Sequence, residues 1–190
     1  MTWFSYQQNA SGYGIYAQRY GNDGTAVGGE INVNTAATSY QAQSPAIASL
    51  SDGGYIVTWR AYGQDGLGYG IFAQRYAADG TAFDNEFRVN TTTTSYSYYP
   101  DIESLSDGGY VVTWTSYQSN GPSYDVYARR YAADGVASGN DVLVNTVTVS
   151  DQIQSSIASL SDGGYVVTWM SYQQDGDRYD IYAQRYGNDG

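Results

Sequence analysis

Three near-identical stretches decide the fold: SLSDGGYIVTW (residues 49–59), SLSDGGYVVTW (104–114) and SLSDGGYVVTW (159–169). They recur every 55 residues. Each stretch joins a turn signal, Ser-Asp-Gly-Gly, to a run of Tyr, Val, Ile, Thr and Trp, which are residues enriched in β-strands. Self-similarity at a fixed period is typical of repeat architectures. The sequence therefore predicts several copies of one β-rich unit.

A second motif repeats with the same spacing. Its copies are GYGIYAQRY (12–20), GYGIFAQRY (68–76), SYDVYARRY (123–131) and RYDIYAQRY (178–186). Shorter endings, INVNT, FRVNT and LVNT, close at Thr35, Thr91 and Thr146. Taken together, the motifs predict four short strands in each unit. For one complete unit we expect these strands at 45–50, 54–62, 69–76 and 85–90.

The links between the expected strands favour a β-propeller. Tight links containing Asp and Gly join the first strand to the second and the third to the fourth, and the other two links are longer. Four antiparallel strands followed by a long link are typical of a propeller blade. The strand 54–62 carries apolar or β-branched groups on both faces, as a blade between two neighbours requires. We predict an all-β, propeller-like array; a β-trefoil, which also has four-stranded units, is the alternative.

The repeat domain is expected to contain two complete and two partial blades. Residues 1–24 match residues 167–190, so the first blade lacks its first strand and the last blade lacks its fourth. The expected blades span residues 1–35, 45–91, 100–146 and 156–190 of a single repeat domain. Because incomplete blades leave strand edges unpaired, copies of the chain itself, as a dimer or larger assembly, are expected partners.

Composition excludes several classes of function. The 190 residues include no His, Lys or Cys, and eight Arg stand against 19 acidic residues, for a net charge of −11. Catalysis by Ser-His-Asp or Cys-His, a lysine Schiff base and the usual zinc or haem ligands are therefore excluded. The negative charge disfavours nucleic acid and anionic membranes. No apolar run approaches the roughly 20 residues that span a bilayer, so membrane insertion is not expected.

The candidate ligand-binding face is the end of the blades that carries the longer links. Long loops held by rigid strands are where binding residues concentrate. Tyrosines and amides gather there, namely Tyr40, Gln41, Gln64, Tyr96, Tyr98, Tyr99, Gln118, Gln152 and Gln174. Tyrosine rings stack on the apolar faces of sugars, and amides bond their hydroxyl groups. These residues are candidate glycan ligands, although the same side chains would also suit packing between blades or a subunit contact.

Acidic residues give weaker signals. Asp52, Asp107 and Asp162 in the tight turns are weak calcium candidates, but Asp followed by Gly is also ordinary turn chemistry. No other cofactor is expected. Asp101 and Glu103 form an acidic pair that the other units lack. Glycoside hydrolysis uses two carboxyl groups, one of which needs a shielded setting that tunes its pKa. Two residues on one strand do not by themselves provide that setting, so we expect no enzyme.

The motifs LSDGGYVVTW, YDIYAQRY and VNT resemble repeats of very large bacterial secreted and surface proteins. Such proteins often also carry calcium-binding RTX or cadherin-like repeats and leave the cell by type I secretion. The resemblance covers essentially the whole chain, although the RTX nonapeptide itself is absent. It implies an extracellular or cell-surface, adhesin-like location. The expected function is a non-enzymatic structural or adhesive module, with a multivalent, lectin-like glycan-binding propeller as the alternative.

Overall fold

The computed structural model describes residues 1–6, 12–35, 42–64, 68–92, 96–117, 121, 123–172, 176 and 178–188. Within these ranges, 14 antiparallel strands form four small sheets, and no helix is present. No described segment is therefore a helix of the length and apolarity needed to cross a membrane. The all-β prediction is confirmed.

Each sheet is a meander in which neighbouring strands follow one another along the chain. Blade 1 contains β1 (Thr2–Tyr6), β2 (Tyr13–Tyr20) and β3 (Ala26–Asn32). Blade 2 contains β4 (Gln43–Ser49), β5 (Tyr55–Tyr62), β6 (Tyr69–Tyr76) and β7 (Ala82–Arg88). Blade 3 contains β8 (Tyr96–Ser104), β9 (Tyr110–Tyr117), β10 (Tyr124–Tyr131) and β11 (Val142–Leu143). Blade 4 contains β12 (Gln152–Ser159), β13 (Tyr165–Tyr172) and β14 (Tyr179–Tyr186).

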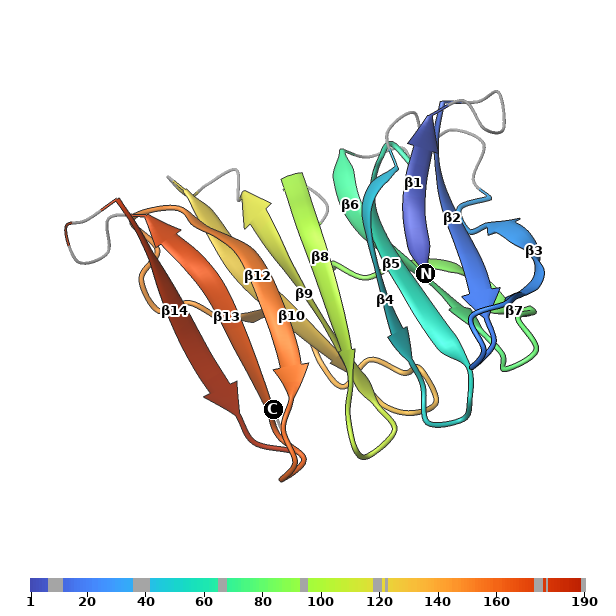
Figure 1. Ribbon diagram of the computed structural model, residues 1–190. Coiled ribbons are helices and arrows are strands. Elements are labelled where there is room, and N and C mark those ends of the chain that lie inside the picture. The colour runs from blue at the N-terminus through green and yellow to red at the C-terminus, as the bar shows by residue number, and fades with distance from the viewer. Residues whose placement is uncertain are drawn as a thin grey trace.

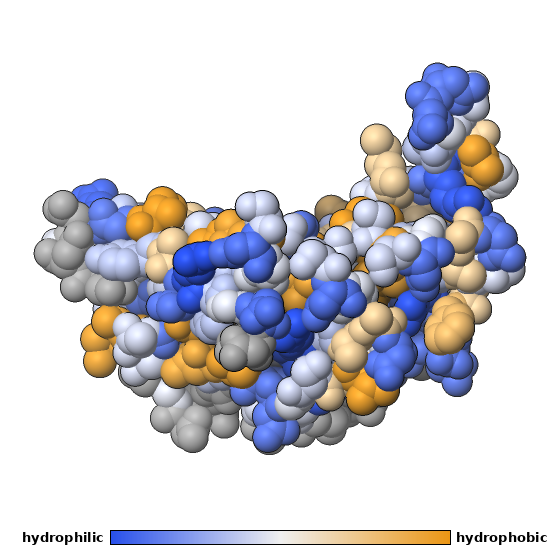
Figure 2. Space-filling model, turned by 90° about the horizontal axis from the view of Figure 1, so that it is seen from below, coloured by the Kyte–Doolittle hydropathy of each residue, from blue (hydrophilic) through white to orange (hydrophobic). Residues whose placement is uncertain are grey.

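The four blades follow one another along an open arc, with β1–β3 at one end and β12–β14 at the other (Figure 1). Figure 2 shows the arc from the end of the tight turns, where hydrophobic patches are scattered among hydrophilic residues. Two four-stranded and two three-stranded sheets confirm the propeller-like array of complete and partial blades. The β-trefoil alternative is wrong. The fourth strand of blade 2 begins at Ala82 rather than at residue 85. It includes an irregularity in its pairing with β6, where Asp84 has a φ of 60°, and nothing in the sequence indicated this irregularity.

The core lies between the blades. In the second, third and fourth blades one tryptophan is buried: Trp59, Trp114 and Trp169. Trp59 packs in one apolar cluster with Ile15 and Ala17 of the preceding blade. The same arrangement recurs around the other two tryptophans. The YVVTW sequence recurs in the blades because each copy packs on the apolar face of the preceding blade.

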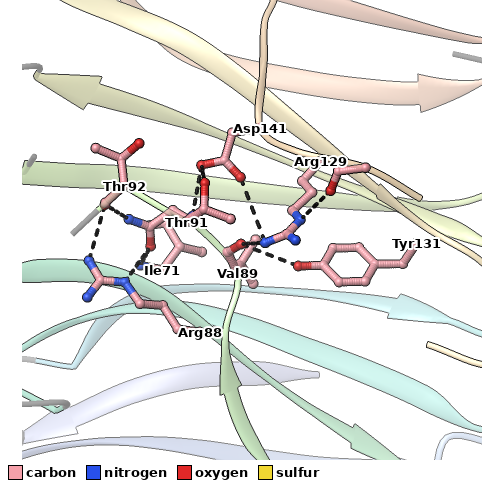
Figure 3. A network of polar contacts seen from close by, with 10 residues as sticks. Ile71, Arg88, Val89, Thr91, Thr92, Arg129, Tyr131 and Asp141 are labelled. Carbon is pink, nitrogen blue, oxygen red and sulfur yellow. Dashed lines mark hydrogen bonds and ion pairs between the residues drawn. The ribbon is translucent and has the colours of Figure 1, made fainter. Parts of the chain in front are cut away.

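The VNT ending of blade 2 fastens that blade internally and to blade 3 (Figure 3). Asn90 Oδ1 accepts a hydrogen bond of 2.8 Å from the backbone N–H of Ile71, within blade 2. The backbone N–H and Oγ1 of Thr91 donate to Asp141 Oδ2 in blade 3, at 2.8 and 2.9 Å. Arg129 Nη1 adds a 2.7 Å bond to the carbonyl oxygen of Val89. Asn34, Asn145 and Thr35 make the corresponding contacts elsewhere in the array.

Replacing Asn90 should therefore weaken the fold. Asn90→Ala leaves the buried N–H of Ile71 without its acceptor, which costs about 1–3 kcal/mol of the free energy of unfolding. Asn32→Ala is the matched control, because Asn32 is an exposed asparagine in β3. Urea denaturation followed by circular dichroism measures both variants. Equal stability of Asn90→Ala and Asn32→Ala would contradict this role of the VNT motif.

Candidate functional site

A hollow of about 330 Å³ lies where blades 2, 3 and 4 meet. It is lined by Arg60, Tyr98, Tyr99, Thr115, Tyr124, Asp151 and Ile153. Arg60 lies near the end of β5, Tyr98 and Tyr99 near the start of β8, and Asp151 just before β12. These positions share the end of the blades that carries the longer links. Side chains from three blades therefore converge on one concave site.

Aromatic rings and one arginine form a platform beside this hollow. The ring centroid of Tyr98 lies 5.4 Å from that of Tyr69, 6.1 Å from that of Tyr124 and 6.2 Å from that of Tyr99. The Arg60 guanidinium lies 4.9 Å from the ring centroids of both Tyr69 and Tyr98. Burial raises the pKa of Tyr98, while Tyr99 remains exposed. The cluster thus consists of tyrosine rings packed against one another and against Arg60, and the ring of Tyr99 is accessible to solvent.

The backbone at Tyr99 adopts a conformation that is uncommon for a non-glycine residue. Its φ is 50°, and the pairing of β8 with β9 shifts between Tyr98 and Asp101. Ser44 and Gln154, the matching residues of blades 2 and 4, have φ values of 52° and 54°. A bulge re-aims the side chain that it carries, and such backbone conformations are frequent at functional sites. Blade 3 uses its bulge to present a tyrosine at the hollow.

Two carboxyl groups lie close to the platform. Asp151 lines the hollow, and its Oδ1 accepts a 3.1 Å hydrogen bond from the backbone N–H of Tyr124. Asp125 is buried, and its Oδ1 accepts a 2.7 Å bond from Asn145 Nδ2. Burial above all, and then the nearby charge of Asp151, raise the pKa of Asp125, although the bond from Asn145 works in the opposite direction. One carboxyl group therefore lines the hollow, and a second one near it is shielded from solvent and has a raised pKa.

Some of the predicted glycan ligands reach this site and others do not. Tyr98 and Tyr99 line the hollow, and exposed Tyr96 has its ring 6.1 Å from that of Tyr69. Gln64 and Gln152 instead pack as tryptophan partners. Gln64 Oε1 accepts from Trp59 Nε1 at 3.2 Å, and Gln152 Oε1 accepts from Trp169 Nε1 at 2.8 Å. The remaining candidates, Tyr40, Gln41, Gln118 and Gln174, lie outside the described residues.

The calcium candidates are engaged in the tight turns. Oδ1 of Asp52, Asp107 and Asp162 accepts from the backbone N–H two residues later, at 2.8, 2.9 and 3.1 Å. Oδ2 of each pairs with an arginine of the same blade: Arg75, Arg130 and Arg185. These carboxylates act as turn residues and ion-pair partners. Within the described ranges, no group of three or more acidic side chains could hold a metal ion.

Asp101 and Glu103 join blade 3 to blade 4. Asp101 Oδ2 accepts from Ser156 Oγ at 3.0 Å and from the backbone N–H of Ile157 at 3.1 Å. Glu103 Oε1 accepts from Ser159 Oγ at 2.7 Å. This acidic pair, which distinguishes one unit from the others in the sequence, therefore serves contacts between blades.

The candidates from sequence did not include Arg60, Tyr124 and Asp125. The available signal was departure from the repeat. Arg60 occupies a position that holds Phe4, Thr115 and Met170 in the other units, and Asp125 replaces a glycine of the first two units. A larger hollow of about 390 Å³ lies between blades 1 and 2 at the tight-turn end. Its lining includes Ala17, Arg19, Gly54 and Tyr55, which the units share, so it has the character of a repeated blade junction.

No family model matches the chain, and no curated protein matches it. Solved structures do share its fold. An endo-arabinase from Bacteroides thetaiotaomicron is 12% identical with a TM-score of 0.57, over 94% of this chain and 68% of that one. An N-acetylgalactosamine deacetylase from F. plautii, in complex with blood group B trisaccharide, is 14% identical with a TM-score of 0.58, over 99% and 68%. The Hadza microbial sialidase Hz136 is 11% identical with a TM-score of 0.61, over 95% and 42%.

These similarities identify the fold as a β-propeller of the type found in carbohydrate-active enzymes, among them five-bladed ones. They overturn two expectations from sequence: that the chain is a structural or adhesive module and that it is not an enzyme. The reason is that the solved structures that share the fold are arabinases, a xylanase, a sialidase and a deacetylase. The propeller-like repeat in the resemblance is confirmed, whereas the association with RTX proteins and adhesins is not supported.

Asp125 should destabilise the fold at neutral pH, because burial disfavours its charged form. Its raised pKa means that its contribution to stability is present below the unfolded-state pKa and is lost as pH rises through the folded-state pKa. The variant Asp125→Asn has no carboxylate to bury, so the loss of stability at high pH does not occur in it. The melting temperature of this variant should exceed that of the wild type at pH 7, and the difference should shrink as the pH is lowered. Scanning calorimetry at several pH values measures this. A lower melting temperature than the wild type at pH 7 would contradict it.

Proposed function

We propose that the chain acts on glycans and binds a sugar in the hollow lined by Arg60, Tyr98, Tyr99, Tyr124 and Asp151. The observation that carries this proposal is the convergence of tyrosine rings, a guanidinium and a carboxylate from three blades in one concave site. Sugars present apolar C–H faces that stack on rings, and hydroxyl groups that bond to charged and polar side chains. Glycan-acting enzymes with the same fold support the proposal.

The elements of this site are held in place before any ligand arrives. Arg60 Nη2 donates to Gln43 Oε1 at 2.7 Å, which helps to hold the guanidinium in place. The backbone N–H of Gln154 donates to Thr115 Oγ1 at 3.1 Å and ties blade 4 to blade 3 beside the hollow. A preorganised site loses little conformational freedom on binding, which favours affinity.

Removal of the exposed ring tests the binding site. Tyr99→Ala should weaken glycan binding by about tenfold or more, because it deletes the aromatic face that is open to solvent. Tyr6→Ala is the matched control, since Tyr6 is an exposed tyrosine of blade 1, far along the arc.

Isothermal titration calorimetry with arabinobiose, a xylo-oligosaccharide, a sialylated oligosaccharide and blood group B trisaccharide measures the affinities. Binding of none of these probes at millimolar concentration, or equal losses in the two variants, would overturn the assignment of this hollow.

Glycoside hydrolysis is the second candidate function, and the paired environments of Asp125 and Asp151 favour it. A hydrolase needs a carboxyl group that keeps its proton to give to the leaving oxygen, and a carboxylate that activates water or attacks the sugar. Asp151 lies at the hollow, which suits the second role. Burial raises the pKa of Asp125, which is the direction that the first role requires, but Asp125 does not line the hollow, so Asp151 carries this candidate function.

Release of reducing sugar separates hydrolysis from binding alone. Asp151→Asn should lower kcat by about a hundredfold or more and leave the melting temperature nearly unchanged. Asp101→Asn is the control, since Asp101 bonds blade 4 and should change stability rather than kcat. Wild-type binding without any release of reducing sugar would leave a glycan-binding domain and reject the hydrolase.

A location outside the cell or on its surface completes this proposal. It rests on the proposal above that the hollow takes a glycan. Fractionation of cells that express the natural protein, followed by immunodetection, would test this location.

A further inference from the structure

We propose that a second copy of this chain docks head to tail, with its blade 1 packed on blade 4 of the first copy. This inference is independent of the glycan proposal. It concerns two faces at the ends of the arc. The trailing face is formed by Val166, Ile181, Ala183 and Arg185 of blade 4, and the leading face by Met1, Trp3 and Tyr20 of blade 1.

The trailing face repeats a surface that the inner blades bury. Ile181 is 71% exposed, whereas Ile71 and Val126, the matching residues of blades 2 and 3, are 0% exposed. Ala183 is also exposed, and its counterparts Ala73 and Ala128 are buried. Blade 4 therefore presents, in nearly the same sequence, the apolar surface on which blade 3 receives blade 4. An exposed patch of this kind marks an interaction site.

The leading face repeats the other side of the same junction. Tyr20 is 51% exposed, whereas Tyr76 and Tyr131, its counterparts in blades 2 and 3, are 5% and 3% exposed. Trp3 is only partly covered, in contrast to buried Trp59 and Trp114. In the inner junctions these tyrosines and tryptophans pack against the isoleucine and alanine of the preceding blade. The two free faces are therefore complementary, and each matches the surface that its counterparts already contact.

An arginine of one blade also lies against the tight turn of the next blade, at two successive junctions. Arg19 Nη2 donates to the carbonyl oxygen of Ala78, in the tight turn of the next blade, at 2.7 Å. A side chain on Gly80 in that turn would come within 2.9 Å of Arg19 Nη1, and one on Gly135 within 3.5 Å of Arg75 Nη1. Arginine from one blade thus covers the turn glycine of the next.

The ends of the arc hold the two halves of this contact. Arg185 has a side-chain exposure of 66%, against 14% for Arg75 and 18% for Arg130. Gly24, the matching turn glycine of blade 1, has no described residue within 4 Å of the position that a side chain would take. In the docked pair, Arg185 of one copy covers the turn at Gly24 of the other. Apolar and polar features therefore specify the same partner and the same orientation.

Charge substitutions on each face test the proposal with the full chain. The wild type should form dimers or larger assemblies whose mass increases with concentration, as measured by sedimentation velocity. Ile181→Glu disables the trailing face, and Tyr20→Glu disables the leading face. Each substitution should raise the dissociation constant by about a hundredfold or more, because a carboxylate would be buried in an apolar contact. Val149→Glu, at an exposed apolar residue in the link between blades 3 and 4 that belongs to neither face, should associate like the wild type.

Mixing the two disabled variants gives the decisive result. Each retains one intact face, so an equimolar mixture should form a heterodimer and nothing larger, while each variant alone is monomeric. Such complementation also shows that both variants are folded. A monomeric wild type at all concentrations overturns the proposal. So does a Tyr20→Glu variant that associates normally, because two trailing faces would then be packed against each other.

Discussion

The architecture depends on one repeated packing contact: an isoleucine or valine and an alanine of one blade against the tryptophan and tyrosine of the next. Neither sheet face is fully polar, so a blade of this sequence is stabilised by packing against its neighbours. The VNT hydrogen bonds and the arginine contacts add direction to this nonspecific attraction. Asn90 closes the meander of its own blade, and Thr91 bonds the carboxylate of the following blade. Apolar burial thus drives the stacking of blades, and the polar groups fix their register.

Much of this architecture could be predicted from the sequence, because the same motifs recur in each unit. The Ser-Asp-Gly-Gly turns, the strand composition and the tryptophan period each follow from local rules, and every copy confirms the others. The irregularities could not be predicted. Asp84 and Tyr99 adopt left-handed backbone conformations without being glycine, and local propensity gives no reason to expect either. Their conformations are set by pairing with the adjacent strand, which is a tertiary effect.

The candidate site could be predicted only in part. Reasoning from loop length named Tyr98 and Tyr99 at the end of the blades with the longer links, and both line the hollow. Gln64 and Gln152, named with them, accept hydrogen bonds from the indole N–H groups of Trp59 and Trp169, because a buried indole N–H requires an acceptor. Arg60 was not named, because the candidates were chosen by their position in loops and Arg60 lies within a strand. In a repeat protein the shared residues build the scaffold, and the residues that differ are free to take on chemistry.

The bulge at the start of each innermost strand has a consequence for how such a site can change. The same left-handed position holds Ser44, Tyr99 and Gln154, three side chains of very different size and polarity, without altering the sheet around it. Blades 2, 3 and 4 thus each supply one position that accepts different side chains. Selection could exchange a ring for a hydroxyl or an amide in any blade separately. If the hollow takes the proposed sugar, such exchanges would change ligand preference while the core sequence stays constant.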